Sequence, residues 1–216
     1  MDQDTFLALR PFAYHTTAAR HLESLRETRQ LQSAARLTAR AAAEAPAGAE
    51  ADPQVTRRLK PVTLRIGVHE VYLRDQRGLE PSAIRFDADW DLARFVAHVN
   101  GLVSFWPGTE SGPTDMGRRH WERLRSAAEP LVVLRVPTHD LLHAEGQPGA
   151  QVSRCHSGAA HLRQGRRVER GGATFTALEA FRAPPVDVQE LLFADVAHLP
   201  ASTEYATSFA GPWLAL

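Results

Sequence analysis

The chain has 216 residues, of which 44% are hydrophobic and 23% are charged, as in a single globular domain. Lys and Arg number 25 and so do Asp and Glu, so the zero net charge excludes a strongly basic nucleic-acid-binding protein but not a local basic patch. The single cysteine, Cys155, excludes an internal disulfide framework and fits a reducing compartment. The first residues, MDQDTF, contain no apolar run, and no stretch approaches the roughly 18 apolar residues of a membrane span. We therefore expect one cytoplasmic domain over residues 1–216, without membrane contact.

The N-terminal segment PFAYHTTAARHLESLRETRQLQSAARL begins at Pro11. Leu22, Leu25 and Leu31 follow a helical spacing, which predicts a helix or a helix pair from Thr17 onward. In one interpretation Thr16 or Thr17 caps the first turn of that helix through its side-chain oxygen. In the other, His15 and Thr16 face a ligand.

The rest of the chain predicts a mixture of helices and strands. Period-two alternation predicts two strands within VTLRIGVHEVYLRDQ, after a surface loop, AAAEAPAGAEADPQ. A helix is expected in FDADWDLARFVAHVNG, with Asp87 or Asp89 as its cap and Asn100-Gly101 as its end. The later segments are, in order, a strand in LVSFWPG, a helix in GPTDMGRRHWERLRSAAE, a strand in PLVVLRVPT, a helical turn in HDLLHAEG, and short strands near Val152, at Thr174-Phe175 and in VQELLFADV. We expect an α+β fold in which N-terminal helices pack on a bent, mostly antiparallel sheet.

Three separated stretches carry residues suited to binding or catalysis. They are Tyr14-His15-Thr16-Thr17, LVSFWPG followed by GRRHWERL, and VDVQELLFADVAHLPASTEY. Each has an ordinary structural explanation when taken alone, because histidines often pack or cap near helix starts and aromatic pairs are usually core. Together they are a stronger indication than any one of them.

Together, these stretches resemble an uncharacterised family of bacterial proteins with the patterns P-x-x-Y-H-x-T, F-W-P-G, L-R-V-P-T, S-G and V-x-E. This resemblance covers most of the chain. The pattern is similar in turn to the ADP-ribosyltransferase superfamily, in the style of DarT-type DNA ADP-ribosylating toxins and tRNA 2′-phosphotransferases, whose His-x-Thr-like opening is HTTAARHLESLRETRQL here. The resemblance implies an ADP-ribosyltransferase-like fold and NAD as a substrate or nucleotide ligand. The acceptor would be a nucleic acid or a small molecule.

The resemblance also implies a role for each matching residue. Breaking the bond between nicotinamide and ribose builds positive charge on the ribose, which a carboxylate can stabilise. Glu190 matches the late glutamate with that role, and Glu204 and Glu179 are competitors. His15 matches the first-strand histidine, which holds the adenosine side or the ribose of the ligand, and the resemblance implies that His15 is catalytic together with Glu190. The remaining implied NAD-binding residues are Thr16, Thr17, Phe105, Trp106, Arg118, Arg119, Arg154 and Ser157.

Two departures from the superfamily pattern affect the implied activity. Phe105 and Trp106 stand where the superfamily often has tyrosine, so an aromatic face is kept and a hydroxyl is lost. Val188 stands two positions before Glu190, where a polar residue is common. This second change weighs against transfer to amino-acid side chains.

Other interpretations remain open from the sequence. His139 and His143 are spaced to share a helix face, which a zinc site could use, although no HExxH motif is present and no metal is expected. Cys155 could be a nucleophile if a base lay beside it. The run LRQGRRVERGG could contact phosphates or be a solvated loop. A non-catalytic nucleotide- or partner-binding module is the main alternative to an enzyme.

Overall fold

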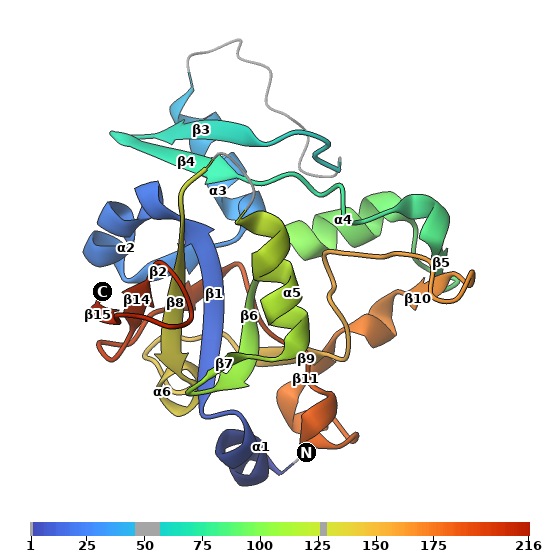
Figure 1. Cartoon of the computed structure of the whole chain (residues 1–216). Coiled ribbons are helices and arrows are strands. Elements are labelled where there is room, and N and C mark those ends of the chain that lie inside the picture. The colour runs from blue at the N-terminus through green and yellow to red at the C-terminus, as the bar shows by residue number, and fades with distance from the viewer. Residues whose placement is uncertain (1, 46–56, 126–128) are drawn as a thin grey trace.

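A computed structural model describes residues 2–45, 57–125 and 129–216. Within these residues the fold is α+β, with six α-helices and a large antiparallel sheet (Figure 1). The helices are α1 (Gln3–Leu9), α2 (Leu22–Thr28), α3 (Ala34–Glu44), α4 (Leu92–Asn100), α5 (Asp115–Leu124) and α6 (Thr138–Leu142). The strands are β1 (Phe12–Ala18), β2 (Gln30–Gln32), β3 (Val62–Ile66), β4 (His69–Leu73), β5 (Ile84–Phe86), β6 (Leu102–Thr109), β7 (Gly112–Pro113), β8 (Leu131–Pro137), β9 (Ala150–Ser153), β10 (Val168–Arg170), β11 (Thr176–Ala177), β12 (Glu190–Ala194), β13 (Val196–His198), β14 (Glu204–Ala206) and β15 (Leu214–Ala215).

The main sheet has nine strands in the order β11-β9-β12-β6-β1-β8-β14-β15, with β7 paired to β6. Strand β1 lies in its middle, antiparallel to both β6 and β8. Phe12, Ala13 and Tyr14 pair with β6, whereas the pairing with β8 runs from Phe12 to Ala18. Strand β12 pairs with β6 and β9, also antiparallel. The order places segments far apart in the chain on neighbouring strands.

The segment from Thr17 differs from the predicted helix. Strand β1 extends to Ala18, so Thr16 and Thr17 are strand residues and cap no helix. β-branched residues suit a pleated strand, where both faces here are buried. A short 3-10 turn (Ala19–His21) follows, and α2 then ends at Arg29, whose positive φ of 52° breaks the helical run before α3. The predicted helix is thus two short helices separated by β2.

The later elements follow the sequence predictions, except that Thr174 ends a 3-10 turn capped by Phe175, so the strand predicted at Thr174-Phe175 lies at Thr176–Ala177 instead. Strands β3 and β4 form a hairpin beside α3, at the top of Figure 1, and β6, β8, α5 and α6 occur where apolar runs and helical spacing place them. The cap of α4 is neither Asp87 nor Asp89 but Asp91, whose carboxylate accepts from the Arg94 N–H at 2.7 Å. The helix ends at Gly101, as expected. The predicted surface loop AAAEAPAGAEADPQ overlaps the end of α3, and most of it lies outside the described residues.

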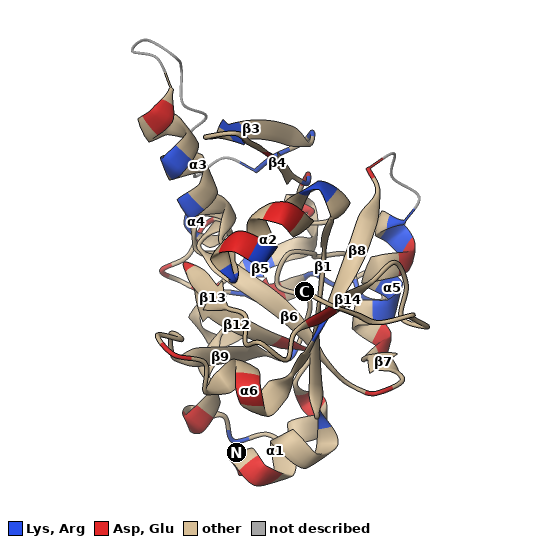
Figure 2. Ribbon diagram, turned by 90° about the vertical axis from the view of Figure 1, so that its left-hand side faces the viewer, with Lys and Arg blue, Asp and Glu red and all other residues tan. Residues whose placement is uncertain are grey.

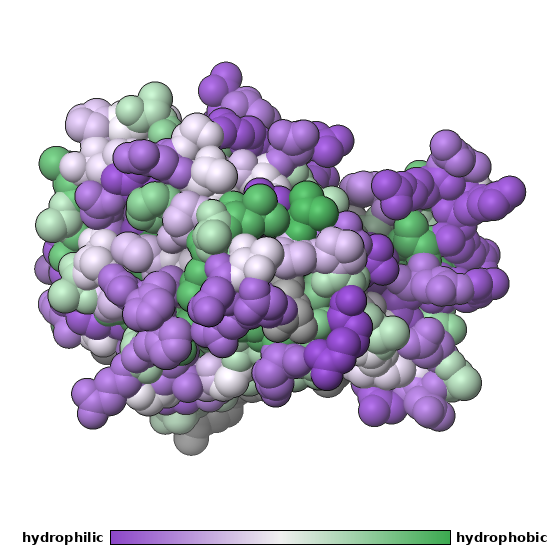
Figure 3. Space-filling view, turned by 90° about the horizontal axis from the view of Figure 1, so that it is seen from below, coloured by the Kyte–Doolittle hydropathy of each residue, from purple (hydrophilic) through white to green (hydrophobic). Residues whose placement is uncertain are grey.

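The two faces of the sheet are buried in different clusters. The largest contains Phe105, Leu134, Leu191 and Phe193, and a smaller one contains Tyr14, Trp106, Trp121 and Val133. Acidic and basic residues are interspersed along the helices and loops of the ribbon (Figure 2). The face seen from below is largely hydrophilic with apolar residues near its middle (Figure 3). Within the described residues no helix has the length and apolarity to cross a membrane.

Candidate functional site

The three stretches singled out in the sequence lie on three consecutive strands. His15 is on β1, Trp106 is on β6, and Glu190 is the first residue of β12. In the sheet order β12 is next to β6, and β6 is next to β1. The strand predicted for VQELLF after the Pro184-Pro185 loop is therefore present, and it brings Glu190 to the strand that carries Trp106.

Tyr14 and His15 point to opposite faces of β1, as strand geometry requires. Tyr14 is 1% exposed and packs with Trp106 and Trp121. His15 lies 5.5 Å from the Phe105 ring, between ring centroids. Its Nδ1 donates to the Ser104 carbonyl at 2.8 Å. Burial, and to a lesser degree the positive charge of Arg74, lowers the pKa of His15 to about 4, so the imidazole is neutral at pH 7.

The side chains of Phe105 and Trp106 also point to opposite faces of the sheet, although the two residues are adjacent in sequence. Phe105 is fully buried in the largest apolar cluster and contacts Phe193. Trp106 lies on the other face, where its ring is 4.9 Å from His156 and 5.1 Å from His120, centroid to centroid. Of the two predicted aromatic residues, only Trp106 is close to Glu190, through His156.

Glu190 is 0% exposed, and both carboxylate oxygens are hydrogen bonded. Oε2 accepts from the Ser157 N–H at 2.9 Å, and Oε1 lies 2.9 Å from Nδ1 of His156. Nε2 of His156 in turn lies 3.1 Å from Nδ1 of His120, on α5. Ser157 therefore meets Glu190 through its backbone. A buried carboxylate requires such partners, because an unpaired charge in the interior is costly.

Arg74 follows β4 and completes this region. One of its Nη atoms donates to the Thr16 carbonyl at 3.2 Å, while the other is buried without a hydrogen-bond partner in the described structure. Burial lowers the pKa of Arg74 to about 10, which leaves it charged at neutral pH. Its charge contributes to the lowered pKa values of both His15 and His120. The region thus combines one buried carboxylate with a cation and three imidazoles.

Arg118, Arg119 and Arg154, predicted as phosphate ligands, line one groove of about 620 Å³. Arg10 and Arg163 line the same groove, whereas Asp115 is its only acidic lining residue among those described. The Arg154 guanidinium is also 2.8 Å from Asp187. The groove reaches the Glu190 region, because Gln189 lines it and Gly108 of β6 does too. Its several arginines and its volume suit a ligand with more than one phosphate.

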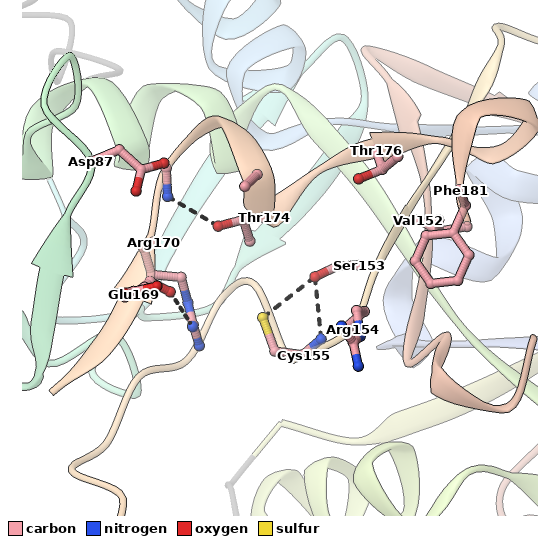
Figure 4. Close-up of a pocket in the computed structure, with 12 residues that line it drawn as sticks. Asp87, Val152, Ser153, Arg154, Cys155, Glu169, Arg170, Thr174, Thr176 and Phe181 are labelled. Atoms are coloured by element: carbon pink, nitrogen blue, oxygen red, sulfur yellow. Dashed lines mark hydrogen bonds between the residues drawn. The ribbon is translucent and has the colours of Figure 1, made fainter. Parts of the chain in front are cut away.

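Arg154 also lines a second, smaller cavity of about 220 Å³ (Figure 4). Ser153 and Cys155 line it with Arg170, and the Ser153 hydroxyl is 3.4 Å from the Cys155 sulfur. Burial raises the pKa of the Cys155 thiol, so the thiolate needed by a nucleophile is disfavoured at neutral pH. The nucleophilic interpretation of Cys155 loses support for that reason.

The remaining alternatives have structural roles. Glu204 pairs with Arg135 at 2.6 Å across β14 and β8, and Glu179 is exposed on a 3-10 turn away from Glu190's partners. His139 and His143 stack at 4.5 Å. Among the described residues no group of three or more His, Cys, Asp or Glu side chains is arranged to hold a metal.

Sequence reasoning missed three residues of this region: Arg74, His120 and His156. His120 lies within GRRHWERL. The sequence analysis selected that stretch because of its arginines and not because of His120. His156 stood out only as the neighbour of Cys155. What joins His156 to both Glu190 and His120 is the turn after β9, whose position no local pattern reveals.

Comparison with known proteins assigns the chain to a family but indicates no activity for it. No curated protein matches the chain. No solved structure matches it either. A family model described as "Family of unknown function (DUF7002)" matches residues 11–197, which is most of the chain, and the protein belongs to that family.

Proposed function

We propose that this protein binds NAD and transfers its ADP-ribose to an acceptor, either a nucleic acid or a small molecule. One observation supports the proposal most. The three stretches that resemble ADP-ribosyltransferases lie on the consecutive strands β1, β6 and β12, with Trp106 and Glu190 both in contact with His156. Stretches so far apart in sequence have no local reason to be neighbours.

The arginine groove supplies the natural place for the diphosphate of NAD. Guanidinium groups bind phosphate oxygens in pairs of parallel hydrogen bonds. Arg118, Arg119 and Arg154 line the groove, and Gln189 stands immediately before Glu190. A ligand with its diphosphate on these arginines would extend its ribose toward the Trp106–Glu190 region. Trp106 is 4% exposed and packs against His120 and His156, so in this proposal it positions those two rings and does not itself stack on nicotinamide.

Glu190 would contribute through its charge. As the nicotinamide–ribose bond breaks, positive charge develops on the ribose, and a fixed negative charge in a water-poor site stabilises it. The Glu190 carboxylate contacts no open space, so its charge reaches the ligand across the His156 ring. His15 faces Phe105, on the side of the sheet opposite Tyr14 and Trp106, so the proposal assigns it no contact with a ribose in the Trp106–Glu190 region.

Nicotinamide release from NAD tests the proposal, with nucleic acids and small molecules added as acceptors. Glu190→Gln removes the charge and keeps the shape, so we expect NAD binding to persist by calorimetry and turnover to fall about 10²-fold or more. Glu179→Gln is the matched control, because that side chain is exposed, and its turnover should equal that of the wild type. Arg118→Ala should weaken NAD binding. Thermal melts establish that each variant is folded before its turnover is compared.

A second candidate is a non-catalytic nucleotide-binding module. The observation that favours it is the burial of Glu190, which leaves neither carboxylate oxygen free for a ribose hydroxyl. This candidate predicts NAD binding that depends on Arg118, with no nicotinamide release by the wild type under any condition. Absence of both binding and release contradicts both candidates.

A further inference from the structure

A chain of hydrogen bonds runs from the buried Glu190 through His156 to His120. The first link, from Oε1 to Nδ1 of His156, is 2.9 Å, and the second, from Nε2 of His156 to Nδ1 of His120, is 3.1 Å. The two imidazole rings are almost perpendicular, at 87°. Trp106 packs against both rings. Such packing holds the rings in place and keeps the two links aligned.

The carboxylate determines which nitrogen of each ring carries hydrogen. An ionised carboxylate only accepts, so Nδ1 of His156 must donate to it. In a neutral ring Nε2 of His156 is then an acceptor, and Nδ1 of His120 must donate to it. Nε2 of His120 is left as a lone pair. No partner for it is found among the described residues, and His120 as a residue is half-buried, so it is not sealed in the interior.

We propose that Glu190, His156 and His120 form a proton relay in which Nε2 of His120 takes the proton from the attacking group of the acceptor. His120 is then the catalytic base, and His156 and Glu190 are positioning residues. This inference rests on the proposed function and deepens it. The acceptor must present a group that loses a proton on attack, a hydroxyl or an N–H of a base or small molecule.

The step balances as follows. The bond between the ribose carbon and the nicotinamide nitrogen breaks, and its electron pair neutralises the pyridinium of the leaving nicotinamide. The acceptor oxygen or nitrogen forms the new bond to that carbon and gives its proton to Nε2 of His120. The Nδ1 proton of His120 passes to Nε2 of His156. The result is a neutral His120 and an imidazolium at His156, 2.9 Å from the Glu190 carboxylate.

The surroundings explain why the proton would move on rather than stay. Burial, and then the charges of His156, Arg74 and Arg123, hold the pKa of His120 far below its ordinary value, with His15 adding a smaller effect. A positive charge on His120 is therefore disfavoured, whereas one on His156 faces a carboxylate. The relay therefore places the positive charge on His156, whose ring faces the Glu190 carboxylate.

His120 is placed where an acceptor could reach it. It follows Arg118 and Arg119 on α5, and Met116, one helical turn earlier on the same face, lines the arginine groove. His120 is not one of the groove's described lining residues, so a ligand held on the arginines would have to extend one helical turn beyond Met116 to reach Nε2 of His120.

Nitrogen-15 NMR of the histidine rings tests the relay without any substrate. At neutral pH we expect His156 and His120 both to carry hydrogen on Nδ1. In Glu190→Gln, whose amide can donate as well as accept, these two tautomers should no longer be fixed. A His120 ring that carries hydrogen on Nε2 at neutral pH would overturn the relay.

Turnover tests the base. His120→Ala should slow nicotinamide release to an acceptor by about 10²-fold or more, the usual size of general-base catalysis, and added imidazole should restore part of it. His161→Gln, at an exposed position, is the control expected to match the wild type. If His120→Ala releases nicotinamide at the wild-type rate, His120 is not the catalytic base. A wild type that releases no nicotinamide contradicts the proposed function instead, and the NMR spectra still decide whether the relay exists.

Discussion

Tyr14 is held by its ring and by its hydroxyl, and the two contributions can be separated by substitution. The hydroxyl donates to the Thr109 carbonyl at 2.5 Å, and the ring meets Phe209 edge to face at 5.7 Å between centroids. Tyr14→Ala should lower the free energy of unfolding by about 3–5 kcal/mol, as for other buried aromatics. Tyr14→Phe should lower it by about 0.5–1.5 kcal/mol, because only one hydrogen bond is lost. Urea titration of both variants gives the difference, and equal losses would contradict this division.

His15, the next residue, shows how far a local motif can be interpreted. Tyr14 is buried while His15 faces the other side of β1, because neighbouring strand residues point to opposite faces. The sequence did not predict that His15 would donate to Ser104, a residue 89 positions away. His15→Ala leaves that carbonyl without its donor, so we expect a loss of about 1–3 kcal/mol even if His15 also binds a ligand. A melting temperature alone therefore cannot separate the two roles, and NAD calorimetry is the necessary second measurement.

At the level of elements, α5 approaches β6 closely because of Gly117. A Cβ at that position would lie 2.8 Å from Cβ and Cγ of Trp106 and 2.8 Å from Cβ of Pro113. Helix propensity alone predicts that Gly117→Ala stabilises the protein by up to about 1 kcal/mol. We expect the opposite, a loss of about 1–3 kcal/mol, because the methyl group forces the helix away from Trp106.

Chemical denaturation measures the sign of this change. Gly149→Ala is a suitable control, since a Cβ there meets nothing within 4 Å and its effect should be small. A Gly117→Ala variant more stable than the wild type would show that α5 moves away without cost. The Trp106–His120 contact would then be looser than its 5.1 Å centroid distance indicates.

The predictable elements were those with strong local patterns. Apolar runs bounded by Pro and Gly located β6 and β8, and period-two alternation located the β3–β4 hairpin. The threonines of β1 were misassigned because Thr is favoured both in strands and at helix caps. The cap of α4 was misplaced because three aspartates precede the helix, and the chain direction after Asp87, whose N–H donates to the Arg170 carbonyl at 3.1 Å, decides which one is used.

At the scale of the whole molecule, the strand order is what the sequence could not provide. Glu190 lies next to β6 because its strand, β12, pairs with both β6 and β9, which are distant from it in the sequence. The same pairing brings the turn with His156 over the carboxylate. The sequence therefore indicates the three distant segments as separate candidates. The residue that connects two of them, His156, can be identified only once the strand order is known.

Histidine burial makes the whole fold sensitive to acid. Besides His15, His21 has a pKa lowered to about 4, chiefly by burial. Its Nε2 accepts from the Tyr72 N–H at 2.9 Å, so Nδ1 must carry the hydrogen that faces the Thr17 hydroxyl at 2.7 Å. Protonation of Nε2 would remove the bond from Tyr72. The folded protein therefore resists binding a proton that the unfolded chain accepts near its ordinary pKa of about 6.5.

The sign of the pH effect follows from this difference. Between pH about 6.5 and 4 the unfolded chain binds more protons at these histidines than the folded protein, so stability falls as the pH falls through that range. Each histidine contributes a slope of at most about 1.4 kcal/mol per pH unit. Urea titrations at several pH values should show the decline, with a shallower slope in His21→Gln, which cannot titrate. Equal slopes in the wild type and His21→Gln would mean that His21 becomes protonated within the folded protein, and that the Tyr72 N–H does not depend on it.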